Sequence, residues 1–247
     1  MLKVNSLSVS YGKRLILEDL SFSLPKGSFT ALLGLNGSGK STLLSALGGS
    51  VPSVGEVRVA GEALSSLMPR ERAKRMALLP QTLPTPPFTV AETVLCGRSP
   101  YMTFAQRPAE RDLCAVREAM EKTGVSPLAE RLLSSLSGGE RQMTLLAMVL
   151  AQDTPLLLLD EPTSFLDKAR ERRFWEVLSD IRKETGLTVL AAMHDLTAAA
   201  RVADRALILS EGRTVFDGET EELLSSSLVE DIFGVRRYPT EDGPVFV

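Results

Sequence analysis

The feature that most constrains the fold is a glycine-rich stretch at residues 34–42, which reads Gly-Leu-Asn-Gly-Ser-Gly-Lys-Ser-Thr. It contains the pattern G-x-x-x-x-G-K-[ST], typical of a loop that follows a strand, opens a helix and holds phosphate with its backbone amides. The neighbouring residues agree, because Phe29–Leu33 is a continuous apolar run and Lys40–Leu47 has a helical pattern. The sequence therefore predicts an α/β fold built around a strand–loop–helix unit.

Helices and strands alternate in the C-terminal part of the chain. From residue 140 onward, helices are predicted at Glu140–Gln152, Lys168–Glu184 and Leu196–Ala203, and strands at Leu156–Leu159, Leu187–Met193 and Ala206–Leu209. This alternation implies a mostly parallel sheet with helices packed on it.

The N-terminal part has a different pattern, in which apolar and polar residues alternate. It predicts an N-terminal antiparallel β part, with strands at Leu2–Val4, Ser6–Val9, Leu20–Leu24 and Gly55–Ala60. A helix is expected next at Leu64–Lys74, followed by a strand at Arg75–Leu79.

A proline-rich segment at residues 82–89 marks a boundary, and the pattern is helical over 90–136, most strongly at Pro108–Lys122. We therefore expect a single domain over residues 1–247. Its core with the β part would comprise residues 1–81 and 141–247, and an inserted helical subdomain would comprise residues 82–140.

Composition narrows the class of function. A net charge of −3 over 247 residues lacks the basic footprint of a nucleic-acid binder, so no nucleic-acid partner is expected. Apolar runs such as Leu145–Ala151 are too short to span a bilayer, and the start of the chain lacks a secretion signal, which favours the cytosol. Cys96 and Cys114 form no metal-binding or redox pattern, and we expect buried or half-buried thiols.

The glycine-rich loop predicts a triphosphate site. Its backbone N–H groups and the N-terminus of the following helix would hold phosphate, Lys40 would reach the β- and γ-phosphates, and the Ser41 hydroxyl would coordinate Mg²⁺. An ordinary glycine-rich turn is the alternative. The candidate ATP-binding residues here are Asn36, Gly37, Ser38, Gly39, Lys40, Ser41 and Thr42.

Two acidic residues, Asp160 and Glu161, end the apolar run Leu156–Leu159. Ligands bind at the carboxyl ends of strands in such sheets. Asp160 therefore suits the Mg²⁺ shell, and Glu161 suits a base or a water-positioning residue. A solvated acidic turn is the alternative.

A second possible anion cradle reads Leu136-Ser137-Gly138-Gly139-Glu140. Ser137 could cap the following helix, and Gly138 and Gly139 leave backbone amides uncovered. The alternative is an ordinary helix start. His194, the single histidine, ends a predicted strand at the same edge and could donate a hydrogen bond to a γ-phosphate.

Taken together, these motifs resemble those of the ATP-binding subunits of ATP-binding-cassette (ABC) transporters, and the resemblance covers nearly the whole chain. It implies a P-loop NTPase core. Residues 34–42 resemble the Walker A loop, 136–140 the signature motif, 156–161 the Walker B strand with its catalytic glutamate, and 164–167 the D-loop. By the same resemblance, Gln81 contacts Mg²⁺ and the attacking water, His194 is the switch histidine and Tyr11 stacks on adenine, although Tyr11 could also be an edge-of-core residue.

The resemblance implies a head-to-tail homodimer that encloses two ATP molecules, each between the Walker A loop of one chain and the signature motif of the other. Catalytic roles then fall to Glu161, His194, Gln81 and Lys40. Dimer closure would drive integral-membrane permease subunits on the cytoplasmic face. A substrate-binding protein would take part indirectly. The chain departs from the family pattern at Leu35, Phe165, Met143 and Met148.

A narrower resemblance joins this chain to the importers of iron–siderophore, haem and cobalamin. It rests on Cys96–Tyr101, Arg107-Pro108, Arg111-Asp112 and residues 194–205. Phe88, Tyr101, Met102 and Phe104 could form a permease-binding cleft, or belong to the subdomain core. Three alternatives stay open: an importer of another small solute, a soluble ABC ATPase for metal-cluster assembly, which soluble partners would favour, and a DNA-repair type, which DNA-stimulated ATPase activity would favour.

Overall fold

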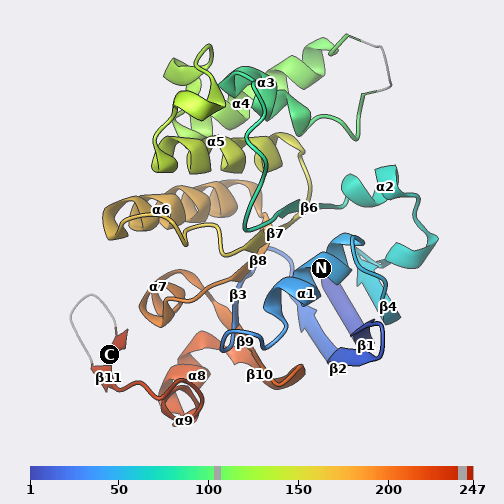
Figure 1. The fold of residues 1–247 in the computed structure, drawn as a ribbon, viewed down its shortest axis with the longest axis vertical. Coiled ribbons are helices and arrows are strands. Elements are labelled where there is room, and N and C mark those ends of the chain that lie inside the picture. The colour runs from blue at the N-terminus through green and yellow to red at the C-terminus, as the bar shows by residue number, and fades with distance from the viewer. Residues whose placement is uncertain (103–106, 239–243, 247) are drawn as a thin grey trace.

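A six-stranded sheet forms the centre of the computed structural model, which describes residues 1–102, 107–238 and 244–246 (Figure 1). Its strand order is β10-β9-β3-β8-β7-β6, and five of the six strands run parallel. The strands are β3 (Phe29–Leu33), β6 (Met76–Leu79), β7 (Leu156–Asp160), β8 (Thr188–Ala192), β9 (Arg205–Ser210) and β10 (Arg213–Glu219). The predicted α/β class with a mostly parallel sheet is confirmed.

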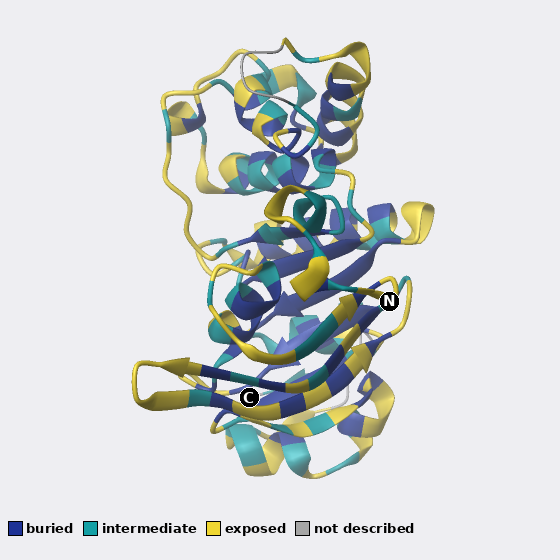
Figure 2. Ribbon diagram, turned by 90° about the vertical axis from the view of Figure 1, so that its right-hand side faces the viewer, coloured by how far each residue is buried: buried dark blue, intermediate teal, exposed yellow. Residues whose placement is uncertain are grey.

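The parallel arrangement brings the carboxyl ends of four strands to one edge. β3 leads into the glycine-rich loop, β6 into Gln81, β7 into Glu161 and β8 into His194. All residues of β3, β7 and β8 are buried (Figure 2), which matches the apolar runs in the sequence.

A smaller antiparallel sheet, ordered β2-β1-β4-β5, confirms the predicted N-terminal β part. Its strands are β1 (Leu2–Tyr11), β2 (Arg14–Leu24), β4 (Val54–Val59) and β5 (Glu62–Ala63). The two short strands predicted before residue 10 are one strand, β1, because Ser6 adopts a φ of 48° where the register with β2 shifts and the strand continues beyond this irregularity.

Helices cover both faces of the six-stranded sheet. Helix α1 (Lys40–Gly48) and the smaller sheet pack on the face that carries Leu32, Leu158 and Leu190. The other face is covered by α5 (Gly138–Ala151), α6 (Lys168–Thr185), α7 (Leu196–Val202), α8 (Thr220–Ser225) and α9 (Leu228–Phe233).

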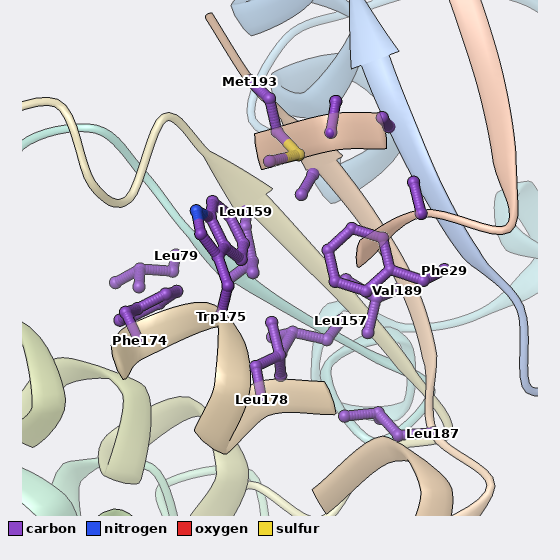
Figure 3. Packing of buried hydrophobic residues seen from close by; sticks show 14 of the residues in the cluster. Phe29, Leu79, Leu157, Leu159, Phe174, Trp175, Leu178, Leu187, Val189 and Met193 are labelled. Carbon is purple, nitrogen blue, oxygen red and sulfur yellow. The ribbon is translucent and has the colours of Figure 1, made fainter. Parts of the chain in front are cut away.

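Aromatic residues of α6 anchor this second layer (Figure 3). Trp175 makes edge contacts with Phe29 on β3 and with Phe174, at centroid distances of 5.9 and 5.1 Å. Burying an aromatic side chain of this size contributes on the order of 1.5–3 kcal/mol. The packing therefore holds α6 against the sheet.

A separate hydrophobic cluster joins three helices beyond α6. Helices α3 (Val90–Cys96), α4 (Glu110–Thr123) and α5 bury residues such as Val94, Val116 and Ala147 against one another. Figure 1 shows these helices stacked at one end of the molecule. The proposed boundaries of the helical subdomain at residues 82 and 140 remain a prediction.

Some local predictions were wrong. Residues 64–74 form a 3₁₀ turn at Leu64–Ser66 and a short helix α2 (Pro69–Ala73), because Leu67 and Met68 are extended. The residue before a proline avoids the helical region, so Pro69 separates the two turns. Cys96 and Cys114 are exposed. They lie on sides of α3 and α4 that the helical cluster leaves uncovered.

The C-terminal part contains elements that the sequence patterns did not predict. These are β10, α8, α9 and a short hairpin of β11 (Arg237–Tyr238) and β12 (Val245–Phe246). Each of the two helices and the two hairpin strands spans six residues or fewer, too short for a period to be read.

Candidate functional site

The glycine-rich loop requires glycine at two positions. A Cβ at Gly34 would lie 2.3 Å from the Leu209 carbonyl oxygen, and one at Gly39 would lie 2.4 Å from Leu17. Both residues also have positive φ values, 147° and 105°, which side chains disfavour. The loop between β3 and α1 therefore packs closely against β9 at Gly34 and against β2 at Gly39.

Lys40 lies inside this loop. Its Nζ donates to the carbonyl oxygens of Gly34 at 2.8 Å and Leu35 at 3.3 Å. Burial lowers the pKa of the Lys40 amine, although the carboxylates of Glu161 and Asp160 oppose the shift. The ammonium group is thus fixed at the N-terminus of α1, where the helix dipole and the loop amides also favour an anion.

Ser41 and Asp160 meet across the sheet edge. The Ser41 hydroxyl donates to Asp160 Oδ1 at 3.0 Å, although the two residues are 119 positions apart. Burial raises the pKa of Asp160, and the hydrogen bond from Ser41 opposes this shift. A hydroxyl and a carboxylate oxygen so close together match the hard oxygen ligands that Mg²⁺ takes beside substrate phosphates. The residues present therefore fit Mg²⁺.

Glu161 is the meeting point of the predicted catalytic side chains. Its Oε2 accepts a hydrogen bond from Gln81 Nε2 at 2.8 Å and lies 2.5 Å from His194 Nε2. Ser164 Oγ also donates to the Glu161 backbone oxygen at 3.1 Å. The sequence predicted His194 at this edge, and the family resemblance implied that Gln81 contacts Mg²⁺ and the attacking water. The contacts of both side chains with Glu161, and that of Ser164, were not foreseen.

The backbone at Glu161 is unusual. Its φ is 48°, a left-handed conformation that costs a non-glycine residue on the order of 1 kcal/mol or more. The Glu161 N–H donates to the Ala192 carbonyl at 3.2 Å, which stabilises the turn against β8. This conformation aims the carboxylate at His194 instead of continuing the strand, and such strain is a feature of functional sites.

The second predicted cradle is a capped helix start. Ser137 Oγ accepts from the Glu140 N–H, and Glu140 Oε2 accepts from the Ser137 N–H at 2.8 Å, which is a capping box. Gly138 is exposed and a Cβ there would meet nothing within 4 Å, whereas one at Gly139 would lie 2.8 Å from Arg170. Ser137 is thus a cap, as predicted, and Gly138 leaves room for an approaching group.

The two cradles lie on opposite faces of the six-stranded sheet. The glycine-rich loop opens α1, which packs on the face with Leu32 and Leu158, whereas α5 packs on the face with Leu157 and Leu159. Figure 1 shows α5 beyond α6, with α1 on the other side of the strands. One chain therefore does not bring Ser137 to the phosphate loop.

Tyr11 lies on the hairpin between β1 and β2 and is 52% exposed. Because Leu17 of β2 contacts Gly39, this hairpin borders the phosphate loop. Its ring is open to an incoming base, but stacking on adenine stays a prediction.

The residues suggested for a permease cleft lie in different surroundings. Phe88 is 39% exposed, whereas the Tyr101 ring packs under the Arg98 guanidinium at 3.9 Å and its hydroxyl donates to the Asp153 carbonyl. Met102 is half-buried, and its carbonyl accepts a hydrogen bond from Arg70. Phe104 lies outside the described residues. Phe88 is the most accessible of the described three.

Arg98 and Asp112, part of the stretch that suggested metal-chelate importers, form a buried ion pair at 3.1 Å. Arg98 also donates to the Ala151 carbonyl at 2.8 Å, and Asp112 accepts the Ala109 N–H at 3.1 Å. The pair links α3, α4 and α5. Its role is in packing, away from Glu161.

Comparison with known proteins agrees with this geometry. The ABC transporter family profile matches residues 17–164, which include the phosphate loop, Gln81, Ser137 and Glu161. The chain belongs to the ABC transporter family. It is an ATP-binding subunit, and nucleotide binding and ATPase activity are the family's properties.

Relatives in this family have closely similar sequences. The ferric enterobactin transport ATP-binding protein FepC of Escherichia coli K12 is 41% identical over 95% of this chain and 88% of its own length. The iron(3+)-hydroxamate import ATP-binding protein FhuC of Bacillus subtilis is 39% identical over 95% and 88%. The hemin import ATP-binding protein HmuV of Vibrio parahaemolyticus is 40% identical over 99% and 96%.

Solved ABC structures share the fold. A metal-chelate type ABC transporter in an inward-facing conformation has a TM-score of 0.85 and 30% identity, over 100% of this chain and 96% of that chain. A dimeric ATP-binding cassette bound to ADP and Pi has a TM-score of 0.77 and 25% identity, over 89% and 99%. Within the described part of this ABC subunit, no helix is both long and apolar enough to cross a bilayer.

Proposed function

We propose that this ABC subunit hydrolyses ATP to power a membrane importer of an iron chelate, haem or cobalamin. The observation that carries the hydrolytic part is the convergence of Gln81 and His194 on the Glu161 carboxylate, beside the Ser41–Asp160 pair. The cargo class is supported by FepC, FhuC and HmuV, whose names refer to enterobactin, hydroxamate and hemin.

The phosphate loop would hold the triphosphate of ATP. Lys40 Nζ already points at the Gly34 and Leu35 carbonyls, so its charge is placed for the β- and γ-phosphates. The N–H groups of Asn36 to Thr42 would complete the cradle. Ser41, Asp160 and Gln81 would hold Mg²⁺, which when bound neutralises charge on the phosphate oxygens.

Hydrolysis would be an in-line attack of water on the γ-phosphorus, with Glu161 polarising the water. In the present geometry the Glu161 carboxylate is engaged by Gln81 and His194. A γ-phosphate offers His194 a competing anionic acceptor, so the imidazole would move from Glu161 to the phosphate. Glu161 would then be free to accept a hydrogen bond from water.

Two copies would complete the sites. Ser137 and Gly138 lie on the opposite face of the sheet from the phosphate loop of their own chain, and an ABC cassette of the same fold is a dimer. In a head-to-tail homodimer the Ser137 cap of one chain would cover the ATP held by the loop of the other, stacked on Tyr11. The exposed Phe165, four residues after Glu161, would face this interface.

The other partners would be integral-membrane permease subunits, with a substrate-binding protein acting through them. We place the chain in the cytoplasm, on the inner face of the membrane. Phe88, seven residues after Gln81 in the sequence, offers an exposed apolar contact for a permease segment. Cysteine crosslinking from position 88 to the permease tests this contact, and its complete absence in an assembled transporter would contradict it.

The hydrolytic assignment is tested with Glu161→Gln. Removing a general base slows its reaction roughly 10²–10⁴-fold, so this variant should bind ATP with wild-type affinity while its phosphate release falls by that factor. It should also accumulate as an ATP-bound dimer in gel filtration. Glu184→Gln is the matched control, because Glu184 lies at the far end of α6 in an exposed pair with Lys122. Normal turnover by Glu161→Gln would refute the assignment.

The transport role is tested by co-purification. An importer subunit should bring down a permease and show cargo-dependent ATPase activity with an iron chelate, haem or cobalamin in reconstituted vesicles. Purification with soluble cluster-assembly proteins instead would favour that alternative role, while the hydrolytic assignment would stand.

A further inference from the structure

Lys168 occupies a position that helix electrostatics disfavours. It is the first residue of α6, directly after the N-cap Asp167. A cation there faces the positive end of the helix dipole. A residue that is locally unfavourable, like a lysine at a helix N-terminus, often marks a functional constraint. Two carboxylates compensate, since Lys168 Nζ bonds Glu171 Oε2 at 2.9 Å and forms an ion pair with Asp195.

Asp195 directly follows His194 and holds the start of α7. Its Oδ1 accepts the Ala198 N–H at 3.0 Å as the helix N-cap, which leaves Oδ2 for Lys168. Burial opposes ionisation of Asp195, but the hydrogen bonds from Lys168 and the backbone outweigh it and lower the pKa. The orientation of the His194 segment thus depends on a side chain of α6.

Glu171 extends the same contacts to the segment after Glu161. Its Oε1 accepts from the Thr163 hydroxyl at 3.1 Å, and its side chain is only 12% exposed. Lys168, Glu171 and Asp195 therefore connect three segments: the loop at residues 162–167, the start of α6 and the start of α7. The loop carries Ser164 and the His194 segment carries His194, which are two of the three side chains that contact the Glu161 carboxylate; the third is Gln81.

We propose that Lys168 is a positioning residue that ties the loop after Glu161 to the helix after His194, so that both segments move together when nucleotide binds. The proposal rests on the hydrolytic role of Glu161 and His194. With the Lys168–Asp195 contact intact, His194 moves to the γ-phosphate together with the loop at residues 162–167. Without it, α7 shifts independently and the fraction of correctly aligned sites falls.

The chain carries a built-in probe of this tie. Trp175 is its single tryptophan and lines an open pocket of about 790 Å³ together with Lys168, Glu171, His194 and Asp195. The indole is buried, and its Nε1–H has no hydrogen-bond partner in the described part of the chain. Acrylamide quenching of Trp175 fluorescence therefore reports how tightly α6 and α7 pack together beside this pocket, and the readout needs no hydrolysis.

The first experiment compares Lys168→Met, Lys168→Arg and the control Lys122→Met. Lys122 pairs with Glu184 at the other end of α6 and is far from Glu161 in the fold. We expect Lys168→Met to lower kcat roughly three- to tenfold with the KM for ATP unchanged, the loss expected when one positioning contact is removed. Trp175 quenching should increase, and Lys168→Arg should recover most of the activity. The melting temperature should fall by no more than about 4 °C, because an exposed ion pair contributes about 0.2–1 kcal/mol.

The second experiment adds Asp195→Asn, in which the amide oxygen retains the helix cap and the charge is lost. The double variant with Lys168→Met should be no slower than the slower single variant, because both remove the same contact. Additive losses, an unchanged kcat in Lys168→Met, or unchanged quenching in both variants would overturn the proposal. If Glu161→Gln keeps normal turnover, the hydrolytic role fails instead, and the quenching series still decides whether the tie exists.

Discussion

The buried ion pair between Arg98 and Asp112 gives the sharpest stability prediction. The side chains are 5% and 3% exposed, and Asp112→Ala would leave the guanidinium buried without its counter-charge. Removing one partner of such a pair costs about 3–5 kcal/mol. For a chain of this size, each kcal/mol lowers the melting temperature by about 2–4 °C, so the expected decrease is roughly 6–20 °C.

The measurement is thermal and urea unfolding followed by circular dichroism. Glu110→Ala is the control, because Glu110 is on the same helix and pairs with Arg117 at the surface, and we expect its midpoint to match the wild type. The double variant Arg98→Met/Asp112→Leu should be more stable than Asp112→Ala, since it leaves no buried charge. If Asp112→Ala had the same melting temperature as Glu110→Ala, the buried Arg98–Asp112 pair would not contribute the predicted stability.

Three further predictions concern the site. Gly39→Ala should abolish binding of a fluorescent ATP analogue, because its φ of 105° and the 2.4 Å approach to Leu17 exclude a side chain without moving the loop; retained affinity would contradict this. Phe165→Ala should leave the melting temperature unchanged, since Phe165 is 76% exposed, but should weaken the ATP-dependent dimer of Glu161→Gln in analytical ultracentrifugation. Because the Asp195 pKa is lowered on folding, its ionised form stabilises the protein above about pH 4 and this contribution is lost as pH falls through the folded-state pKa. Thermal unfolding between pH 3 and 7 should therefore show the melting temperatures of the wild type and Asp195→Asn converging as the pH falls. A difference in melting temperature that stays constant with pH would contradict the stabilising role of ionised Asp195.

Much of the site could be predicted from sequence because its residues follow buried parallel strands. An apolar run such as Leu156–Leu159 indicates where a strand ends, and parallel strands bring their carboxyl ends to one edge. Lys40, Glu161 and His194 could therefore be predicted to lie near one another. It could not show that Glu161 Oε2 binds both Gln81 and His194, because such contacts depend on side-chain geometry.

Other features depend on contacts between distant segments, which leave no period in the sequence. The Lys168–Asp195 pair spans 27 positions and the Arg98–Ala151 hydrogen bond spans 53. The stretch with Arg98 and Asp112 was noticed for its resemblance to metal-chelate importers, yet its packing role appeared only with the fold. Short elements such as α8 and α9 are stabilised by tertiary packing, so local propensity did not reveal them.

In the proposed homodimer, each hydrolytic site takes its phosphate loop from one chain and its Ser137–Gly138 cap from the other. It is tested by mixing Lys40→Met, which lacks the phosphate-binding amine, with Gly138→Asp, which puts a negative charge where the structure has open space. Each variant alone should be inactive. After subunit exchange in an equal mixture, half of the dimers are mixed and each holds one intact site.

We expect ATP hydrolysis in this mixture to recover to about one quarter of the wild-type rate, as a two-fold symmetric dimer with two equal, independent sites requires. A rate no higher than that of the two separate variants would show that both motifs serve the same chain's nucleotide, and would contradict the account.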